Sequence, residues 1–133
     1  MTPELVVAGF LEGDSTVVGL VGTRIAASQL PQNTTYPAIV YETVDIIPDP
    51  NLNYADGQDL LKARMAITVI AATIPVLKSV HAAIRTAMDH KYLVTVATKT
   101  VRSSRLALLG PLDRDNEAGL WVQTADYIIA YYD

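Results

Sequence analysis

Two histidines, His81 and His90, are the side chains best suited to move protons near neutral pH. Both lie in a segment, Pro75 to His90, whose apolar residues recur at helical spacing. Their nine-residue separation does not place them on one helix face together with a carboxylate. We expect His81 to border the core beside the apolar stripe. We expect His90 to lie at the helix end, where a partial positive charge suits the helix dipole.

Other residue types that could do chemistry also lack the necessary patterns. The sequence has no cysteine, which rules out disulfides, thiol nucleophiles and cysteine zinc sites. The serines show no Gly-x-Ser-x-Gly motif, and Asp113, Asp115 and Glu117 fall in a polar turn, where we interpret them as solvated loop acids. The sequence therefore predicts no catalytic residue, no metal site and no cofactor, and we do not expect an enzyme.

One motif suggests a different class of protein. Residues 19–22, Gly-Leu-Val-Gly, fit the Gly-x-x-Gly pattern whose backbone clamps phosphates in KH nucleic-acid domains. The inner pair supplies no cation, and the chain breaks for Pro31 instead of continuing as a helix. We interpret the two glycines as the end of a short helical turn. A small nucleic-acid-binding domain that uses the basic residues of 60–114 remains an alternative.

Periodicity and turn residues predict the elements that position these side chains. Thr2-Pro3-Glu4 is typical of a helix start, and Asp14 begins a second short turn that Gly22 closes. Apolar patterns predict strands at 37–47, 62–72, 92–102, 104–109 and 119–132. With the helix at 75–90 and a turn at 114–119, these predict an α+β fold. It is a mainly antiparallel sheet packed by one long helix, with a short N-terminal helix.

The composition is that of one folded domain covering residues 1–133. Half of the residues are apolar and 18% are charged, far from the composition of disordered chains. No apolar run reaches the roughly 18 residues that a membrane helix needs. The start, Met-Thr-Pro-Glu, lacks the basic residues of a signal peptide. We therefore expect a product of the cytoplasm with no membrane partner.

Charge is distributed unevenly along the chain. Residues 1–59 carry eight acids and one base, whereas residues 60–114 carry nine bases and two acids. The remaining residues add four acids, and the formal net charge is −4. This split has two interpretations: solvated faces whose signs happen to cluster, or a subunit whose acidic side meets the basic side of a neighbour.

The stretch from Arg24 to Glu42, with Pro31 and Pro37 on either side of a polar turn, carries most information about the family. Its residue pattern, and the order of the elements around it, resemble those of the tail-terminator (tail-completion) proteins of long-tailed bacteriophages. The matching segments are spread over the whole chain: Thr2-Pro3-Glu4, Val21-Gly22, Arg24-Ile25, Leu30-Pro31, Pro37-Ala38-Ile39-Val40-Tyr41, Arg64-Met65-Ala66-Ile67-Thr68-Val69, Ala71-Ala72-Thr73, Gly119-Leu120-Trp121-Val122-Gln123 and Tyr131-Tyr132.

This resemblance implies a structural virion protein. Its subunits would form a homo-oligomeric ring, expected to be a hexamer, at the head-proximal end of the tail. The ring would cap the tail tube and join it to the head, so the implied partners are the major tail-tube protein and the head–tail connector. Another neck protein, a head–tail joining or head-closure subunit, is the alternative within virion assembly.

The charge split and the long loop at 48–59 suggest where subunits meet. We expect this loop to be mobile in the free subunit and ordered by contact with a neighbour or the tail tube, with Tyr54 as an aromatic anchor. The predicted interface residues are Asp49, Asn51, Tyr54, Asp56, Asp59, Lys62, Arg64, Arg102 and Arg105. No specific nucleic-acid binding is expected. An affinity for nucleic acid that falls steeply as the salt concentration rises would instead indicate the nucleic-acid-binding alternative.

Overall fold

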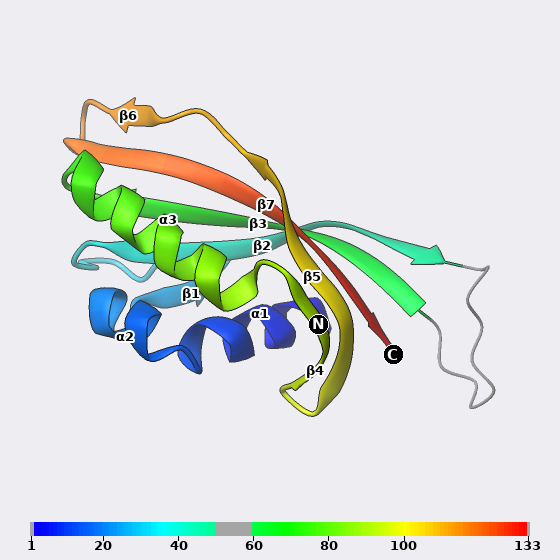
Figure 1. Cartoon of the computed structure of the whole chain (residues 1–133). Coiled ribbons are helices and arrows are strands. Elements are labelled where there is room, and N and C mark those ends of the chain that lie inside the picture. The colour runs from blue at the N-terminus through cyan, green and yellow to red at the C-terminus, as the bar shows by residue number, and fades with distance from the viewer. Residues whose placement is uncertain (1, 50–59, 133) are drawn as a thin grey trace.

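The computed structural model describes residues 2–49 and 60–132, and these form three helices and seven strands (Figure 1). Their bounds are α1 (Thr2–Glu12), α2 (Ser15–Val21), β1 (Ile25–Ala27), β2 (Ala38–Asp49), β3 (Leu60–Ala71), α3 (Ile74–Met88), β4 (Lys91–Val96), β5 (Lys99–Leu109), β6 (Asp113–Asp115) and β7 (Leu120–Tyr132).

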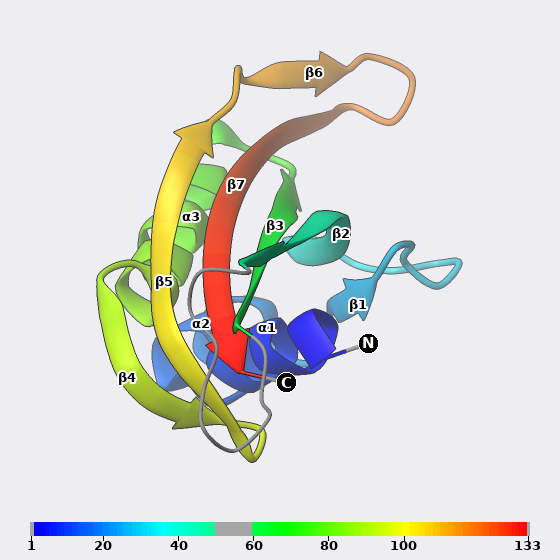
Figure 2. The ribbon, with the colours of Figure 1, turned by 90° about the vertical axis from the view of Figure 1, so that its right-hand side faces the viewer.

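The seven strands form one sheet in the order β1-β2-β3-β7-β5-β4, and β6 pairs with β7 beyond this path. The pairing of β1 with β2 is parallel, and the other pairings are antiparallel. The longest uninterrupted register joins β3 to β7, from Leu60 opposite Tyr132 to Ala71 opposite Trp121. Figure 2 shows that β1 and β4 lie at opposite sides of the curved sheet.

All three helices lie on one face of the sheet, which we call the helix face (Figures 1 and 2). Alternate residues of β3 and β7 point into the core on this side, among them Met65, Ile67, Tyr127 and Ile129. The stripe of α3 that was expected to be apolar packs against them. The opposite face, which we call the open face, has no covering layer in the described part of the chain.

The α+β fold with a mainly antiparallel sheet is confirmed, but its helical layer differs from the prediction. The longest helix, α3, has 15 residues, and it shares the sheet with α1 and α2. The expectation of one long helix was wrong because the first 21 residues supply as much helical cover as residues 74–88. Gly19 lies inside α2 and Gly22 ends it, so the Gly-x-x-Gly segment is not a loop.

The predicted boundary between the strands at 92–102 and 104–109 was also wrong. The turn lies at Ala97 and Thr98, not at residue 103, and β5 runs unbroken through Arg102 and Arg105. Val96 pairs with Lys99, so this is a two-residue hairpin, and both turn residues have positive φ angles of 51° and 65°. Such turns usually contain Asn-Gly or Asp-Gly. An Ala-Thr pair therefore gives no signal for a turn in the sequence.

The predicted loop at 48–59 is partly strand. Pro48 and Asp49 continue β2, where they pair with Leu61 and Leu60. Residues 50–59 lie outside the described residues, and the expectations about this loop's mobility and about Tyr54 lie there with them.

Ser104 provides a test of the core. Its side chain is completely buried, and its Oγ has no hydrogen-bond partner in the described structure. Removing an unsatisfied buried hydroxyl removes a desolvation cost. We expect Ser104→Ala to raise the free energy of unfolding by about 1 kcal/mol in urea denaturation. Ser103→Ala, on the neighbouring half-buried serine, is the control and should change it by less than about 0.5 kcal/mol. A clear loss of stability in Ser104→Ala would contradict this packing.

Candidate functional site

The outer edge of β2 is uncovered over most of its length. Strand β1 pairs only with Ile39, Val40 and Tyr41. From residue 42 onwards, the described strands pair β2 with β3 alone. We call residues 42–48 the β2 extension. Its first part lies beside α1, where the Thr43 hydroxyl donates to Glu4, and its far part projects past the helices in Figure 1. An open strand edge of this kind can accept another strand.

The composition of the β2 extension is that of an interface. Three apolar side chains are exposed: Val44 to 54%, Ile46 to 41% and Ile47 to 60%. The acids Glu42 and Asp45 are exposed beside them. Val44 forms a bulge, since Thr43 pairs with Met65 and the next pair is Asp45 with Arg64. Bulges and charges protect edges from random pairing, but exposed isoleucines on the same edge favour a specific partner.

The opposite edge of the sheet, formed by β4 and β5, carries positive charge. Strands β4 and β5 carry Lys91, Lys99, Arg102 and Arg105, while Tyr92 and Leu93 of β4 are exposed to 58% and 75%. Because of the strand order, the acidic and basic parts of the sequence lie in two separate regions of the fold. The acidic β2 lies near one edge, and the basic β4 and β5 lie at the other.

The open face contains a polar row between these two regions. Arg64 Nε lies 3.0 Å from Asp126 Oδ2, and the hydroxyls of Thr68 and Thr124 are 2.8 Å apart. Both contacts join β3 to β7, because Arg64 and Thr68 are an even number of residues apart in β3 and lie on one face of the sheet. Arg64 thus pairs within its own subunit, which weakens its case as a contact to a neighbour.

Some of the other predicted interface residues lie in the described strands and the rest do not. Lys62 is exposed in β3. Arg102 is half-buried and Arg105 is exposed within β5, although both were expected to flank a strand junction. Asp49 ends β2, and nothing is described of its side chain. Asn51, Tyr54, Asp56 and Asp59 lie outside the described residues. Sequence reasoning missed Glu42, Asp45 and the two isoleucines, whose signal was a mixed acidic and apolar run at the end of a strand.

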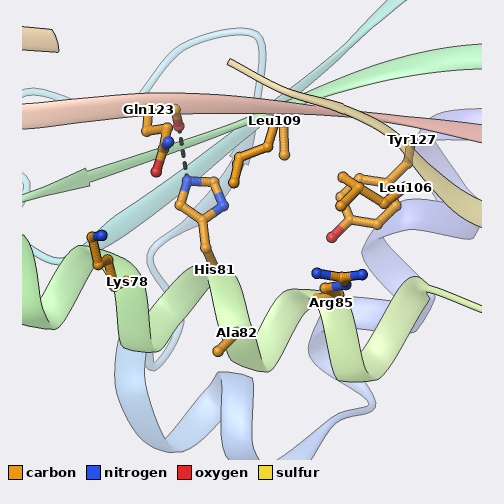
Figure 3. Close-up of a pocket in the computed structure, with 9 residues that line it drawn as sticks. Lys78, His81, Ala82, Arg85, Leu106, Leu109, Gln123 and Tyr127 are labelled. Atoms are coloured by element: carbon orange, nitrogen blue, oxygen red, sulfur yellow. Dashed lines mark hydrogen bonds between the residues drawn. The ribbon is translucent and has the colours of Figure 1, made fainter. Parts of the chain in front are cut away.

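A cavity of about 270 Å³ lies between α3 and the strands β5 and β7 (Figure 3). Leu106, Leu109 and Ala125 supply apolar walls, and Lys78 and Arg85 of α3 supply cations. The lining is thus mixed: apolar side chains from β5 and β7, the polar groups of His81, Gln123 and Tyr127, and basic groups along the α3 side. Such a lining suits an apolar side chain with an acid nearby.

Two polar side chains that line this cavity, His81 and Tyr127, are buried. His81 is buried and its Nε2 lies 3.0 Å from the carbonyl oxygen of Gln123, to which it can donate. Burial lowers the pKa of His81 more than this hydrogen bond raises it. Burial and the nearby charge of Asp89 raise the pKa of Tyr127. Both groups are therefore neutral near pH 7. His81 borders the core, as the sequence predicted.

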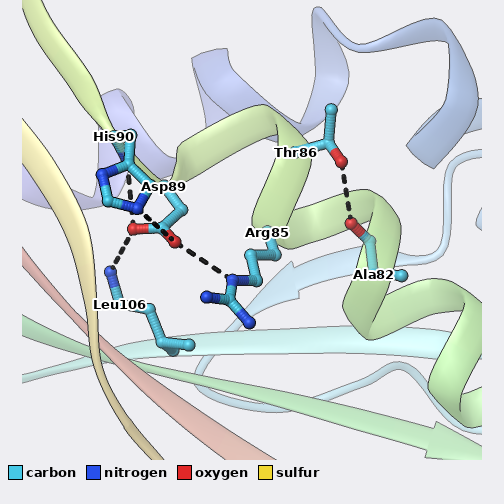
Figure 4. A network of polar contacts seen from close by, with 6 residues as sticks. All are labelled: Ala82, Arg85, Thr86, Asp89, His90 and Leu106. Atoms are coloured by element: carbon cyan, nitrogen blue, oxygen red, sulfur yellow. Dashed lines mark hydrogen bonds and ion pairs between the residues drawn. The ribbon is translucent and has the colours of Figure 1, made fainter.

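Asp89, directly after α3, links the end of this helix to β5 (Figure 4). Its Oδ1 accepts hydrogen bonds from the backbone N–H of His90 and of Leu106, and its Oδ2 lies 3.1 Å from Arg85 Nε. Burial alone would raise the pKa of Asp89. The hydrogen bonds from Leu106 and Arg85 and the nearby His90 outweigh burial and hold the pKa below its usual value. An ionised Asp89 thus fixes the end of α3 against β5.

The described groups do not form a metal site. Within residues 2–49 and 60–132, no group of three or more His, Asp or Glu side chains could hold a metal ion. In the same part of the chain, no helix is long and apolar enough to cross a membrane. The features that stand out are surfaces: an acidic and apolar strand edge, a basic edge and a cavity.

Comparison with known proteins identifies the class of protein that carries these surfaces. The chain matches the family described as Tail completion protein gp17 over residues 6–131. It therefore belongs to this family, and the class is that of structural proteins of phage tails. The residues that suggested tail-completion proteins in the sequence were correctly interpreted.

The fold is similar to that of solved structures. One of them is a chain from the virion of a native gene transfer agent (GTA) particle, with a TM-score of 0.74. The two sequences are 16% identical, and the match covers 96% of this chain and 92% of that chain. No curated protein matches the sequence significantly.

The Asp89 contacts predict a pH-dependent loss of stability. Asp89→Asn removes the charge beside Arg85, and we expect a loss of about 1–2 kcal/mol in the free energy of unfolding at pH 7. Because the folded pKa is lowered, the stabilisation from ionised Asp89 is full above the ordinary pKa, near 3.9, and is lost as the pH falls through the folded pKa. The difference from the parent should therefore shrink below about pH 4.

Urea denaturation at pH 7, 5 and 3.5 measures this effect. Asp113→Asn, at an exposed position of β6, is the matched control and should change stability by less than about 0.5 kcal/mol at each pH. An Asp89→Asn variant as stable as the parent at pH 7 would show that the carboxylate does not hold α3 against β5.

Proposed function

We propose that this protein is a tail terminator: identical subunits form a ring that caps the tail tube and joins it to the head connector. The observation that carries the proposal is the separation of an acidic and apolar edge from a basic edge within one small subunit. Membership of the tail completion family supports it. The role is structural and needs no catalysis.

The separation of the two edges favours a ring over a two-fold dimer. Contact between the acidic edge of one subunit and the basic edge of the next uses two different surfaces. Such head-to-tail contacts repeat around a circle and close if the rotation permits. A two-fold contact would instead place like charges together at one of the edges. The proposed ring has six subunits and lies at the head-proximal end of the tail, and its subunits are made in the host cytoplasm. The GTA chain with a similar fold comes from a virion.

Two other functions differ in what they predict. Another station in the neck, as a head–tail joining or head-closure subunit, would use the same surfaces but leave the tube without a cap. A nucleic-acid-binding domain would use the basic edge on phosphates and would lose affinity steeply with salt. The exposed Tyr92 and Leu93 beside the bases, and the helical position of Gly19, favour a protein partner for this edge.

A complementation experiment tests the function. Virion assembly without this protein should yield filled heads and separate tails. Adding the purified protein should restore joined particles. Electron microscopy of the tail ends should show an additional ring on the restored tubes. Joined particles formed in its absence would contradict a terminator role. Rescue of joining without a change at the end of the tube would indicate the head–tail joining alternative.

Charge reversal tests the contact between edges. Glu42→Lys with Asp45→Lys should impair ring assembly and joining, and so should Arg102→Glu with Arg105→Glu, because each places like charges at the contact. Exposed pairs contribute only about 0–1 kcal/mol each, so the effect depends on several acting together and should weaken as salt screens them. The chain carrying all four changes should recover part of the assembly.

Sedimentation and native mass spectrometry at low and high salt provide the measurement. Asp113→Lys with Glu117→Lys, at two exposed positions in and after β6, is the control for the reversal of Glu42 and Asp45 and has the same change in net charge. Equal assembly of all variants at low salt would mean that the two charged edges are only solvated surfaces.

A further inference from the structure

We propose that the β2 extension of one subunit docks along β5 of the next, with Ile46 inserted into the cavity between α3 and β5. This inference rests on the proposed ring and specifies its contact. The occupant is a second copy of the same chain, which offers an acidic and apolar strand to a basic and apolar site.

The accepting strand has an uncovered edge beside the cavity. Strand β4 pairs with β5 only from Lys99 to Ser104. Beyond that point, the described strands pair β5 with β7 alone, as far as Leu109. The backbone N–H of Leu106 donates a hydrogen bond to Asp89 Oδ1 of the same subunit. Leu108 and Leu109 are exposed to 53% and 51% at this edge, although they are large apolar residues. Exposed apolar residues on an uncovered strand edge are typical of a strand-docking site.

The two sides of the β2 extension match the two sides of this site. Ile46 pairs with Ala63, a buried residue of the helix face, so Ile46 points to the side on which the cavity lies. Asp45 pairs with Arg64 on the open face. Arg105 pairs with Ile128, also on the open face. If the sheets of two subunits continue with their helix faces on the same side, Ile46 meets the cavity while Asp45 meets Arg105.

A subunit cannot fill its own cavity in this way. The extension lies beside the part of β3 that pairs with the end of β7, since Lys62 is opposite Ala130. The cavity lies beside Gln123, Ala125 and Tyr127, earlier in the same strand. Strand β2 is also separated from β5 by both β3 and β7. The extension leaves the body away from the cavity (Figure 1), so its occupant must come from another molecule.

Disulfide trapping tests this contact in assembled tails, because the chain has no cysteine of its own. The double variant Ile46→Cys with Ala82→Cys places one thiol on the extension and one on the exposed side of the α3 wall. Mild oxidation should give a ladder of linked subunits up to the size of the ring. Ile47→Cys with Ala82→Cys is the matched control and should give at least tenfold less linkage, because Ile47 points to the open face.

A second pair, Ile46→Cys with Leu93→Cys, examines the other exposed apolar position of the basic edge. Rings that form normally but are linked through Leu93 and not through Ala82 would overturn the cavity contact while leaving the ring intact. Equal linkage of the Ile46 and Ile47 pairs would also overturn it. Parent tails without any ring would refute the proposed function and this inference together.

Discussion

The pairing of β3 with β7 is the constraint on which the rest of the structure depends. Twelve consecutive residues of each strand are in register, from Leu60 and Tyr132 to Ala71 and Trp121. Their alternate side chains form the centre of the core under α3. This pair also divides the sheet. Everything before it in the sheet order comes from the acidic part of the chain, and β5 and β4 beyond it come from the basic part.

The structural class that the tail completion family defines is compatible with this division. The polar side chains near the cavity serve the fold: His81 contacts Gln123, and Asp89 fixes α3 to β5. Arg64 and Asp126 pair on the open face within the subunit. The apolar side chains left exposed lie instead at strand edges, where another molecule can cover them. The proposed burial of these edges between subunits would explain why a small domain keeps isoleucines and leucines in contact with water.

Much of this fold could be predicted from the sequence because its signals are local. The apolar stripe of residues 75–90 correctly predicted a helix, and the apolar pattern of residues 62–72 correctly predicted a strand. The Ala97-Thr98 hairpin was missed because its residues rarely form such turns. The candidate site was predicted less well. Ion pairing of Arg64 with Asp126 depends on strands 62 positions apart in the sequence, and the uncovered edges of β2 and β5 depend on where their neighbours end. Neither feature has a local signature.

A cryo-electron microscopy map of the assembled end of the tail would test the central claim most directly. The proposed account predicts a closed ring in which the β2 side of each subunit faces the β5 side of the next, with the same contact repeated at every position. A ring whose subunits meet through two copies of the same edge would contradict it. So would a single copy of this protein in the neck, because one subunit cannot make a head-to-tail contact.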